Sequence, residues 1–529
     1  MTKDGPVGGR AGGQHVPGPP PRRRFVLKLA AVLGLLSAGP PAPLPALQCP
    51  NGTPPPCRAP VAAPQTRSIA VLYFDNRSAD SSDAYLADGV TEEIINRLAS
   101  VERLEVKSRT AVGRFRGSAA PPDSIGRALR VTHLLSGSVQ RSGGRLRVSV
   151  ELVRAANGVT TWAGRFDQNA SDLLDIQTAI ADTVARAVAG QLLPRECGAL
   201  VARPTTNPEA WDRFLRGSYR LARRTPGDVR QAIREFETAI GMDPVFAAAH
   251  SRVALSYAVA LDWGWPGFDV QQSIRAGLAA SSRALELDSM LADAWTSRGY
   301  LLRFANARTY AGVREAFQHA LALAPRDAEA HLQYGWARVN MGDVAGGIRT
   351  LTRAVQLDPE RAVSRFTLAW VLLSTHRAED ALAHLDTAIA ADPTTANLYG
   401  LRAWARLATG DTVGARADVA RERTDYRLAR SALTALEARR GDTAAALAEA
   451  ERLVSELAPA PARLVWGAGW QAGSLAVLRK VDRVMDILER IEPQGLAVWW
   501  ITQFPSFDAI RDEPRFAQFV RELGPTTVR

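Results

Sequence analysis

The sequence predicts a small α/β domain, with about three helices on a mixed sheet, followed by an α-solenoid of stacked helix pairs. A tryptophan recurs every 34 residues (370 − 336 and 404 − 370), at Trp336, Trp370 and Trp404. A fixed period of this length is typical of helical units that bury their apolar faces only by stacking. Upstream, the continuous apolar run at 68–74 predicts a strand that is buried on both faces.

The charge of the chain gives no sign of a nucleic-acid-binding surface. The net charge is +11, from 65 Lys and Arg against 54 Asp and Glu, but residues 1–66 hold seven of the basic groups and one acidic group. The rest of the chain therefore has 58 basic and 53 acidic groups (65 − 7 and 54 − 1), a net charge of +5. So small an excess does not predict a basic nucleic-acid footprint. We expect a protein or peptide segment as the partner, and no nucleic acid.

The amino-terminal residues predict a targeting segment rather than a folded domain. Residues 1–21 are rich in Gly and Pro and are expected to form a disordered basic tail. In 22–46, three arginines at 22–24 precede the apolar run 29–39, which is too short as a helix to cross a hydrocarbon layer of about 30 Å. This pattern is typical of a secretory signal; an uncleaved signal that anchors the chain and a misassigned start codon are the alternatives. We expect a periplasmic protein, or one anchored in the inner membrane and facing the periplasm.

A Pro-rich linker is expected at 47–66, where Cys49 and Cys57 either form a disulfide in an oxidising compartment or remain free thiols. Lipidation of Cys49 is not expected, because Gln48 stands where a lipidation signal needs a small residue. The Arg-Arg-x-Phe cluster at 22–25 resembles a twin-arginine signal.

Strand and helix patterns alternate through 67–194, which predicts the α/β domain. Ser142-Gly143-Gly144 predicts a tight turn between two strands. The polar residues that most suggest a site are Asp88-Gly89 and Thr91-Glu92-Glu93, and a helix start with a capping carboxylate and a tight Gly turn is the alternative. Strands are expected at 68–74, 104–108, 133–140, 145–152 and 160–166, and helices at 85–101, 124–129 and 173–192.

This segment resembles the TolB amino-terminal-like domain, also described as FlgO-like. The resemblance implies an α/β fold that commonly accompanies tetratricopeptide repeats in bacterial signalling proteins, and it implies no catalytic activity. Tyr73 departs from the proline that is usual at that position. The matching motifs are Ser-Ile-Ala-Val-Leu-x-Phe at 68–74, Tyr-Leu-Ala-Asp-Gly-Val-Thr-Glu-Glu at 85–93, Gly-Ser-Val-x-Arg at 137–141, Asn-Gly-x-x-x-Trp at 157–162 and Arg-Phe-Asp at 165–167.

Residues 207–492 resemble the tetratricopeptide repeat (TPR), and 493–529 are expected to form a C-terminal helical cap. Asp-Pro pairs at 358–359 and 392–393 should end the second helix of a unit, because proline cannot continue it. Earlier repeat units fit the TPR register with insertions, and the later units match that register only in part. Small residues stand at position 8, where two helices cross closely: Gly335, Ala369 and Ala403.

In this family, positions 2, 5, 9, 12 and 13 of the first helix point into a concave groove, and the recurring tryptophans stand at position 9. They predict either an aromatic row that binds a partner segment or a structural row that packs against the next repeat. The sequence leaves both interpretations open. The candidate groove residues are Trp336, Trp370, Trp404, Leu332, Phe366, Asn340, Leu373 and Leu407.

No catalytic, cofactor or metal motif was found: there is no phosphate-binding loop, no nucleophile elbow, and no His spacing that suits a metal. We therefore expect a non-enzymatic scaffold, exported or membrane-anchored, that binds a protein or peptide segment in the groove of its TPR solenoid. The alternative is a signalling input module, in which the α/β domain senses a small ligand and the repeats relay its state.

Overall fold

The computed structural model describes residues 67–265, 267–305, 310–422, 427–457, 465–491 and 496–524. The predicted tail at 1–21, the signal or anchor at 22–46 and the linker at 47–66 with its two cysteines lie outside the described residues. Among the helices that are described, none is both long enough and apolar enough to cross a membrane.

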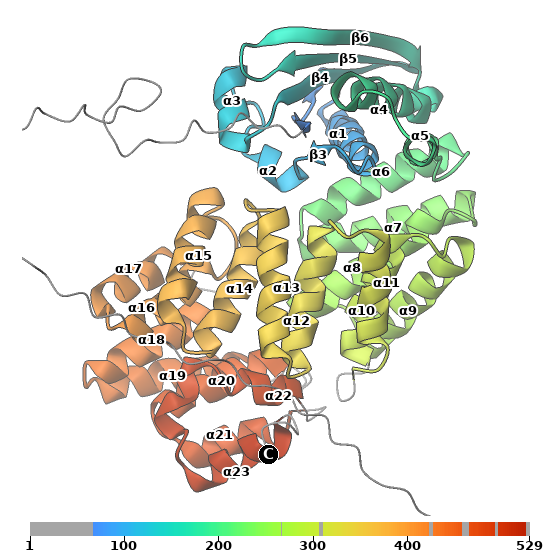
Figure 1. Ribbon diagram of the computed structural model, residues 1–529. Coiled ribbons are helices and arrows are strands. Elements are labelled where there is room, and N and C mark those ends of the chain that lie inside the picture. Colours follow the sequence, from blue (N-terminus) through green and yellow to red (C-terminus); the bar gives the residue numbers. More distant parts are fainter. Residues whose placement is uncertain are drawn as a thin grey trace, which may run out of the picture. The chain divides into compact units, whose positions relative to one another are not determined.

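A mixed sheet is at the centre of the α/β domain, as predicted, but it has six strands where five were expected (Figure 1). The strands are β1 Ser68–Val71, β2 Asp75–Asn76, β3 Glu105–Val106, β4 His133–Ser142, β5 Arg145–Arg154 and β6 Val159–Asn169. Their order is β3-β1-β4-β5-β6, with β2 paired to β4. β1 runs parallel to β3 and β4, and β2 runs parallel to β4, whereas β4, β5 and β6 form an antiparallel meander.

The hairpin between β4 and β5 has the tight turn that the sequence predicts. Ser142 pairs with Arg145, so Gly143 and Gly144 are the two turn residues, and Gly143 has a φ of +60° that favours glycine. All four residues of β1 are buried, which confirms the strand predicted to be buried on both faces. In β5, buried and more exposed residues alternate over much of the strand, so one face is turned away from the core.

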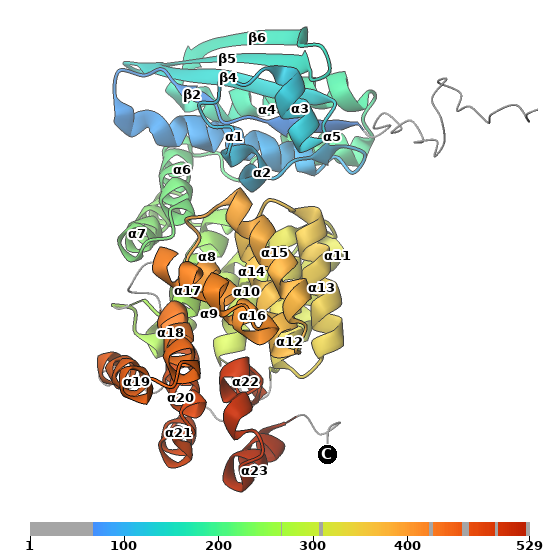
Figure 2. The same ribbon diagram turned by 90° about the vertical axis from the view of Figure 1, so that its left-hand side faces the viewer.

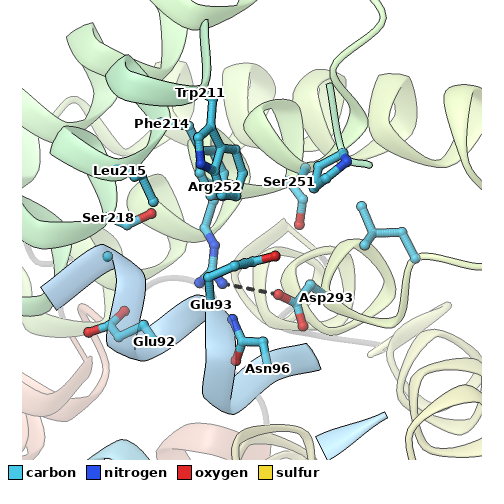
Figure 3. Close-up of a pocket in the computed structure, with 14 residues that line it drawn as sticks. Glu92, Glu93, Asn96, Trp211, Phe214, Leu215, Ser218, Ser251, Arg252 and Asp293 are labelled. Atoms are coloured by element: carbon cyan, nitrogen blue, oxygen red, sulfur yellow. Dashed lines mark hydrogen bonds and ion pairs between the residues drawn. The ribbon is translucent and has the colours of Figure 1, made fainter. Parts of the chain in front are cut away.

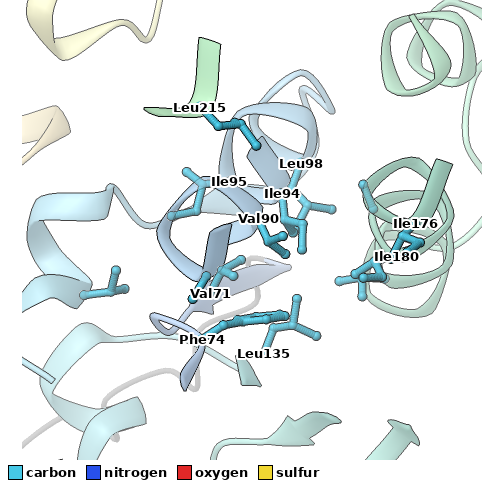
Figure 4. Close-up of a cluster of buried hydrophobic side chains, with 14 of the residues drawn as sticks. Val71, Phe74, Val90, Ile94, Ile95, Leu98, Leu135, Ile176, Ile180 and Leu215 are labelled. Atoms are coloured by element: carbon cyan, nitrogen blue, oxygen red, sulfur yellow. The ribbon is translucent and has the colours of Figure 1, made fainter. Parts of the chain in front are cut away.

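Two helices cover the sheet on one side: α1 and α4 meet through Val90 and Ile94 of α1 and Ile176 and Ile180 of α4, all of them buried (Figure 4). The hydrophobic core of the domain lies between these helices and the sheet. The helices of this part of the chain are α1 Ala84–Ala99, α2 Arg109–Gly113, α3 Pro122–Leu129, α4 Leu173–Ala189 and α5 Pro194–Val201.

The alternative interpretation of Asp88 and Gly89, as a capping carboxylate and a Gly turn, is wrong. A 3-10 turn at Ser81–Asp83 precedes α1, which begins at Ala84, so both residues lie inside the helix. Gly89 instead allows close packing, because a Cβ there would lie 2.9 Å from a methyl group of Leu215.

Eight helix pairs follow in the described part of the chain (Figure 2). The predicted solenoid of helix pairs is thereby confirmed. The pairs are α6 Pro208–Ala222 with α7 Pro226–Met242, α8 Ala247–Trp263 with α9 Val270–Leu287, α10 Ala292–Ala305 with α11 Val313–Leu323, α12 Ala328–Asn340 with α13 Val344–Leu357, α14 Ala362–Ser374 with α15 Ala378–Ala391, α16 Leu398–Thr409 with α17 Thr412–Arg421, α18 Arg427–Arg439 with α19 Thr443–Leu457, and α20 Val465–Val477 with α21 Val481–Leu488.

The periodic residues explain the stacking of the pairs. At the ends of α13 and α15, the N–H groups of Asp358 and Asp392 donate to the carbonyls of Ala354 and Ala388, at 3.0 and 2.9 Å, and both alanines are fully buried. At position 8, a Cβ on Gly335 would lie 2.8 Å from a side-chain carbon of α13. A larger residue would therefore push the two helices of this pair apart.

The C-terminal segment, residues 496–524, consists of α22 Leu496–Ile501, a 3-10 helix η3 at Pro505–Ile510, and α23 Pro514–Leu523. α22 contacts both α12 and α20, which are far apart in the sequence (Figure 1). This segment was expected only to cap the last repeat. It also reaches back to the first helix of the fourth pair.

Candidate partner-binding groove

The inner face is the side of the first helix of each pair that has positions 2, 5, 9, 12 and 13. Trp336 on α12 is half-buried, whereas Trp370 on α14 and Trp404 on α16 are buried, with 6% and 3% of their surfaces exposed. The three rings belong to one hydrophobic cluster that also contains C-terminal residues. The tryptophans therefore do not form an open aromatic row.

The C-terminal segment covers the buried tryptophans. The ring of Phe504 lies 4.9 Å from Trp370, 5.4 Å from Trp404 and 5.3 Å from Trp470 of α20, measured between ring centroids. Trp370 and Trp470 are in edge contact at 4.8 Å. These are favourable aromatic geometries. Both tryptophans thus pack against residues about a hundred positions or more further along the chain.

The remaining predicted residues divide into buried and partly exposed positions. Phe366 is half-buried, 6.0 Å from the Trp370 ring. The side-chain amide of Asn340 donates to the Trp336 carbonyl at 3.0 Å, within its own helix. Only Trp336 and Phe366, of the eight candidates, therefore keep appreciable exposed surface for a partner. The three leucines are buried: Leu332, Leu373 and Leu407.

The N-terminal part of the inner face, on α6, α8 and α10, is covered by the α/β domain. The Tyr85 hydroxyl on α1 donates to the Asp212 carboxylate on α6 at 2.5 Å and accepts from the Arg216 guanidinium at 2.7 Å. Burial and the Asp212 carboxylate raise the pKa of Tyr85 far above its usual range, so the hydroxyl stays protonated and remains a donor. This contact fixes α1 against the first repeat.

A cavity of about 130 Å³ lies where α1 meets the repeats (Figure 3). Glu93 and Asn96 of α1 line it on one side, and Trp211 and Phe214 of α6 form an apolar wall. These two aromatic residues occupy positions 2 and 5 of the first repeat. The register alone would have placed them on the inner face, although the 34-residue period does not single them out.

A second contact between the α/β domain and the repeats is ionic. Arg114, which follows α2, pairs with Glu360, before α14, at 3.1 Å. Within the α/β domain, Arg109 of α2 pairs with Glu92 of α1 at 3.2 Å.

Arg361, next to Glu360, pairs with Glu329. Burial raises the pKa of Glu329, but the guanidinium groups of Arg361 and Arg224 and the hydrogen bond from Gln333 together outweigh it, and the resulting pKa is about 2. Glu329 is therefore ionised at neutral pH.

Sequence reasoning missed Phe504 and Trp470, because neither follows the 34-residue period. The aromatic density of the C-terminal segment, with Trp499 and Trp500 just before Phe504, was the available signal. In the described part of the chain no group of three or more His, Cys, Asp or Glu side chains is arranged to hold a metal ion.

Residues 341–405 match the tetratricopeptide repeat family, so the chain contains TPR units. Residues 65–183 match a second family, described as the HilA/YgeH-like transcriptional regulator, second domain.

One relative is named "Putative adenylate cyclase 3", from Rhizobium meliloti (strain 1021). It is 29% identical over 229 residues, which are 43% of this chain and 39% of the relative. The chain therefore spans well under half of that protein's length.

Two solved structures resemble the repeats. A thermophilic TPR protein of Thermus thermophilus is 20% identical, covers 37% of this chain and 99% of its own, and has a TM-score of 0.32. The pilF protein of Pseudomonas aeruginosa is 18% identical, covers 42% of this chain and 95% of its own, and has a TM-score of 0.34.

Proposed function

We propose that this chain is a non-enzymatic protein-binding scaffold, exported or anchored in the bacterial envelope, whose TPR inner face holds segments of other proteins. The observation behind the proposal is the environment of Phe504. The inner face already holds the aromatic side chain of a protein segment between Trp370, Trp404 and Trp470. A partner segment with an aromatic side chain offers the same chemistry.

The partner would displace the C-terminal segment and then contact the predicted groove residues. Half-buried Trp336 and Phe366 would be met first, because they are partly exposed beside the covered tryptophans. Trp404 would then become accessible, and its indole N–H has no hydrogen-bond partner among the described residues. A partner with a carbonyl at this point would satisfy that donor, which the resident segment leaves unpaired.

Occupation of the groove can be tested in the full chain with Phe504→Ala and, as the matched control, Phe519→Ala in α23. A fluorescent peptide with the sequence 496–510 is added in trans, and its anisotropy is measured. We expect at least about tenfold tighter binding to Phe504→Ala than to the unchanged chain or to Phe519→Ala, because the resident ring no longer competes. Equal binding to all three chains would contradict the proposal. Equal binding of a peptide that has alanine in place of Phe504 would contradict it as well.

Export is proposed from the signal-like pattern at 22–46 and is tested separately. Mass spectrometry of the protein from envelope and cytoplasmic fractions should place it in the envelope and identify its mature N-terminus. Recovery from the cytoplasm alone, with the N-terminus intact, would count against export. We also propose that the partner is not a nucleic acid, since the net charge beyond 1–66 is small.

The second candidate function is a signalling input module, in which the α/β domain senses a small ligand and the repeats relay it. The cavity between α1 and the first repeats supports it, as do the relative named as a cyclase and the match to a regulator domain. The TolB amino-terminal-like motifs at 68–74 and 85–93 support the same context by resemblance. A thermal-shift screen of the full chain with metabolites, nucleotides and glycans tests it, and the absence of any stabilising compound would count against it.

A further inference from the structure

The strand β6 forms a long open edge of the sheet in the α/β domain (Figure 1). It is the last strand in the order β3-β1-β4-β5-β6, it has eleven residues, and no described strand pairs with its outer side. The strand at the other end, β3, has only two residues. Natural sheets commonly protect a long edge with proline, lysine or a bulge. β6 has no proline or lysine, and the irregularity in its ladder, between Leu152 and Val153 of β5, lies near its start.

The backbone of β6 has unpaired hydrogen-bonding groups along this edge. The N–H of Ala170, just after β6, donates to the Gly144 carbonyl at 2.9 Å, so these two residues face each other as a hydrogen-bonded pair. Along an antiparallel ladder, such pairs alternate with pairs whose backbone groups point away from the partner strand. By this alternation the N–H and C=O groups of Ala163 and Arg165 point away from β5. No described residue bonds to them.

The two faces of this edge differ in character. On the face that packs against the core, the Trp162 ring lies over Gly164, where a Cβ would be 2.5 Å from the ring, and Phe166 follows on the same side. Both aromatic residues are only half-buried, so they leave apolar surface beside the edge. On the opposite face, Ala163 and Arg165 are exposed. An added strand therefore meets apolar side chains on one face and polar ones on the other.

The charges on the exposed face favour an acidic partner. Asp167 pairs with Arg145 at 2.8 Å and with Arg147 at 2.9 Å, so its charge is already shared. Glu151, the other carboxylate on this face, lies one pair further along the ladder from Arg165. Arg165 has no ion pair with a described residue. A carboxylate on an added strand would supply that pair, whereas a second copy of the chain would bring the same arginines to the edge.

We propose that β6 pairs with an extended segment of another protein in which apolar and acidic residues alternate. The apolar side chains of the segment would lie beside Trp162 and Phe166, and its acidic side chains beside Arg165. In such strand addition, backbone hydrogen bonds supply affinity and alternate side chains supply specificity. The edge belongs to the α/β domain alone, so the inference does not depend on the proposed groove of the repeats.

The test is fluorescence anisotropy of labelled peptides titrated with the full chain. The probe is acetylated and amidated Val-Glu-Val-Glu-Val-Glu-Val, and the controls have lysine in place of glutamate or proline in place of the central glutamate. We expect saturable binding of the probe and at least about tenfold weaker binding of the lysine peptide, because its charges repel Arg165. The proline peptide should not bind, since proline cannot donate to the ladder. Hydrogen exchange should slow at Ala163 and Arg165 when the probe is bound.

Two variants test the two halves of the proposal. Ala163→Pro removes an N–H that points outward, not toward β5, and should abolish binding of the probe. Arg165→Glu should reverse the preference, with the probe bound at least about tenfold more weakly and the lysine peptide more tightly than by the unchanged chain. The matched control is Arg234→Glu, which reverses an exposed arginine of α7 outside the sheet and should change neither affinity.

The outcomes that overturn the inference are distinct. Absence of probe binding overturns it, and so does equal affinity for the probe and the lysine peptide. If Ala163→Pro loses its folded circular dichroism spectrum, Arg165→Glu decides, and an unchanged preference in that variant overturns the inference. Sedimentation of the chain without peptide gives a further check. A dimer that dissociates in Arg165→Glu, with no probe binding, would assign the edge to a second copy and overturn the acidic partner.

Discussion

Replacement of Phe504 by alanine should release the C-terminal segment from the inner face. The side chain is 1% exposed, and it contacts three indole rings at centroid distances of 4.9 to 5.4 Å. Truncation of a buried Phe to Ala costs about 3–5 kcal/mol. Aromatic pairs add about 0.5–1.5 kcal/mol each beyond burial. We therefore expect a loss near the upper end of that range, about 4–5 kcal/mol.

Urea unfolding followed by tryptophan fluorescence measures this loss, because the rings that Phe504 touches are themselves tryptophans. Phe519→Ala is the matched control, since Phe519 lies in the same segment but is only partly buried. Its truncation should cost about 1 kcal/mol, as for an average point mutation. Hydrogen exchange of the Phe504→Ala chain should show faster exchange in α22 and α23, while the α/β domain is unchanged.

The reasoning would be refuted by a loss below about 2 kcal/mol, well under the range for a buried phenylalanine. It would also be refuted if the two variants were destabilised equally, because the difference in burial is the basis of the prediction. Faster exchange throughout the chain would show instead that the C-terminal segment unfolds together with all the repeats.

Three further predictions concern the repeats. Gly335→Ala should lower the unfolding free energy in urea by about 1–3 kcal/mol, because its Cβ would lie 2.8 Å from the neighbouring helix. Arg402→Met should lower the unfolding free energy by about 3 kcal/mol, because Asp418 loses its ion pair of 2.6 Å while its side chain is only 1% exposed. A second arginine near that carboxylate keeps the cost at the lower end of the range for a broken buried ion pair. The pKa of Glu329 falls from 4.5 to about 2 on folding, so the unfolded chain binds more protons below pH 4.5 and stability should fall as the pH drops from about 4.5 toward 2. Glu329→Gln should flatten this part of the pH dependence of urea unfolding, and an unchanged slope would contradict the lowered pKa of Glu329.

The repeats could be predicted because their determinants are local and periodic. A small residue at position 8 and an Asp-Pro pair at the end of the second helix each act within one unit, so they appear in the sequence at fixed spacing. Gly335 and Asp358 occupy the places that this register gives them. The Gly143-Gly144 turn is a local signal of the same kind.

The environment of the candidate groove could not be predicted, because it depends on contacts over long sequence separations. Trp370 meets Phe504, 134 residues away (504 − 370), and no periodic pattern links the two. Gly89 was misinterpreted for the same reason. Its small size is needed for Leu215 of the first repeat, whereas the local sequence suggested a turn. Register gives the face on which a side chain lies, but not what covers that face.

The two covered regions of the inner face are joined through the middle repeats. The Arg303 side chain on α10 is 6% exposed and pairs with Asp262 of α8 at 2.8 Å. It also donates to Gln333 of α12 at 2.7 Å. In a solenoid each unit contacts chiefly its neighbours, so a change at the first repeats reaches the last repeats through such interfaces. A ligand beside α1 can therefore influence release of the C-terminal segment only if α8, α10 and α12 shift together. The buried hydrogen bonds and ion pair of Arg303 make a concerted shift of these helices less costly than their separation.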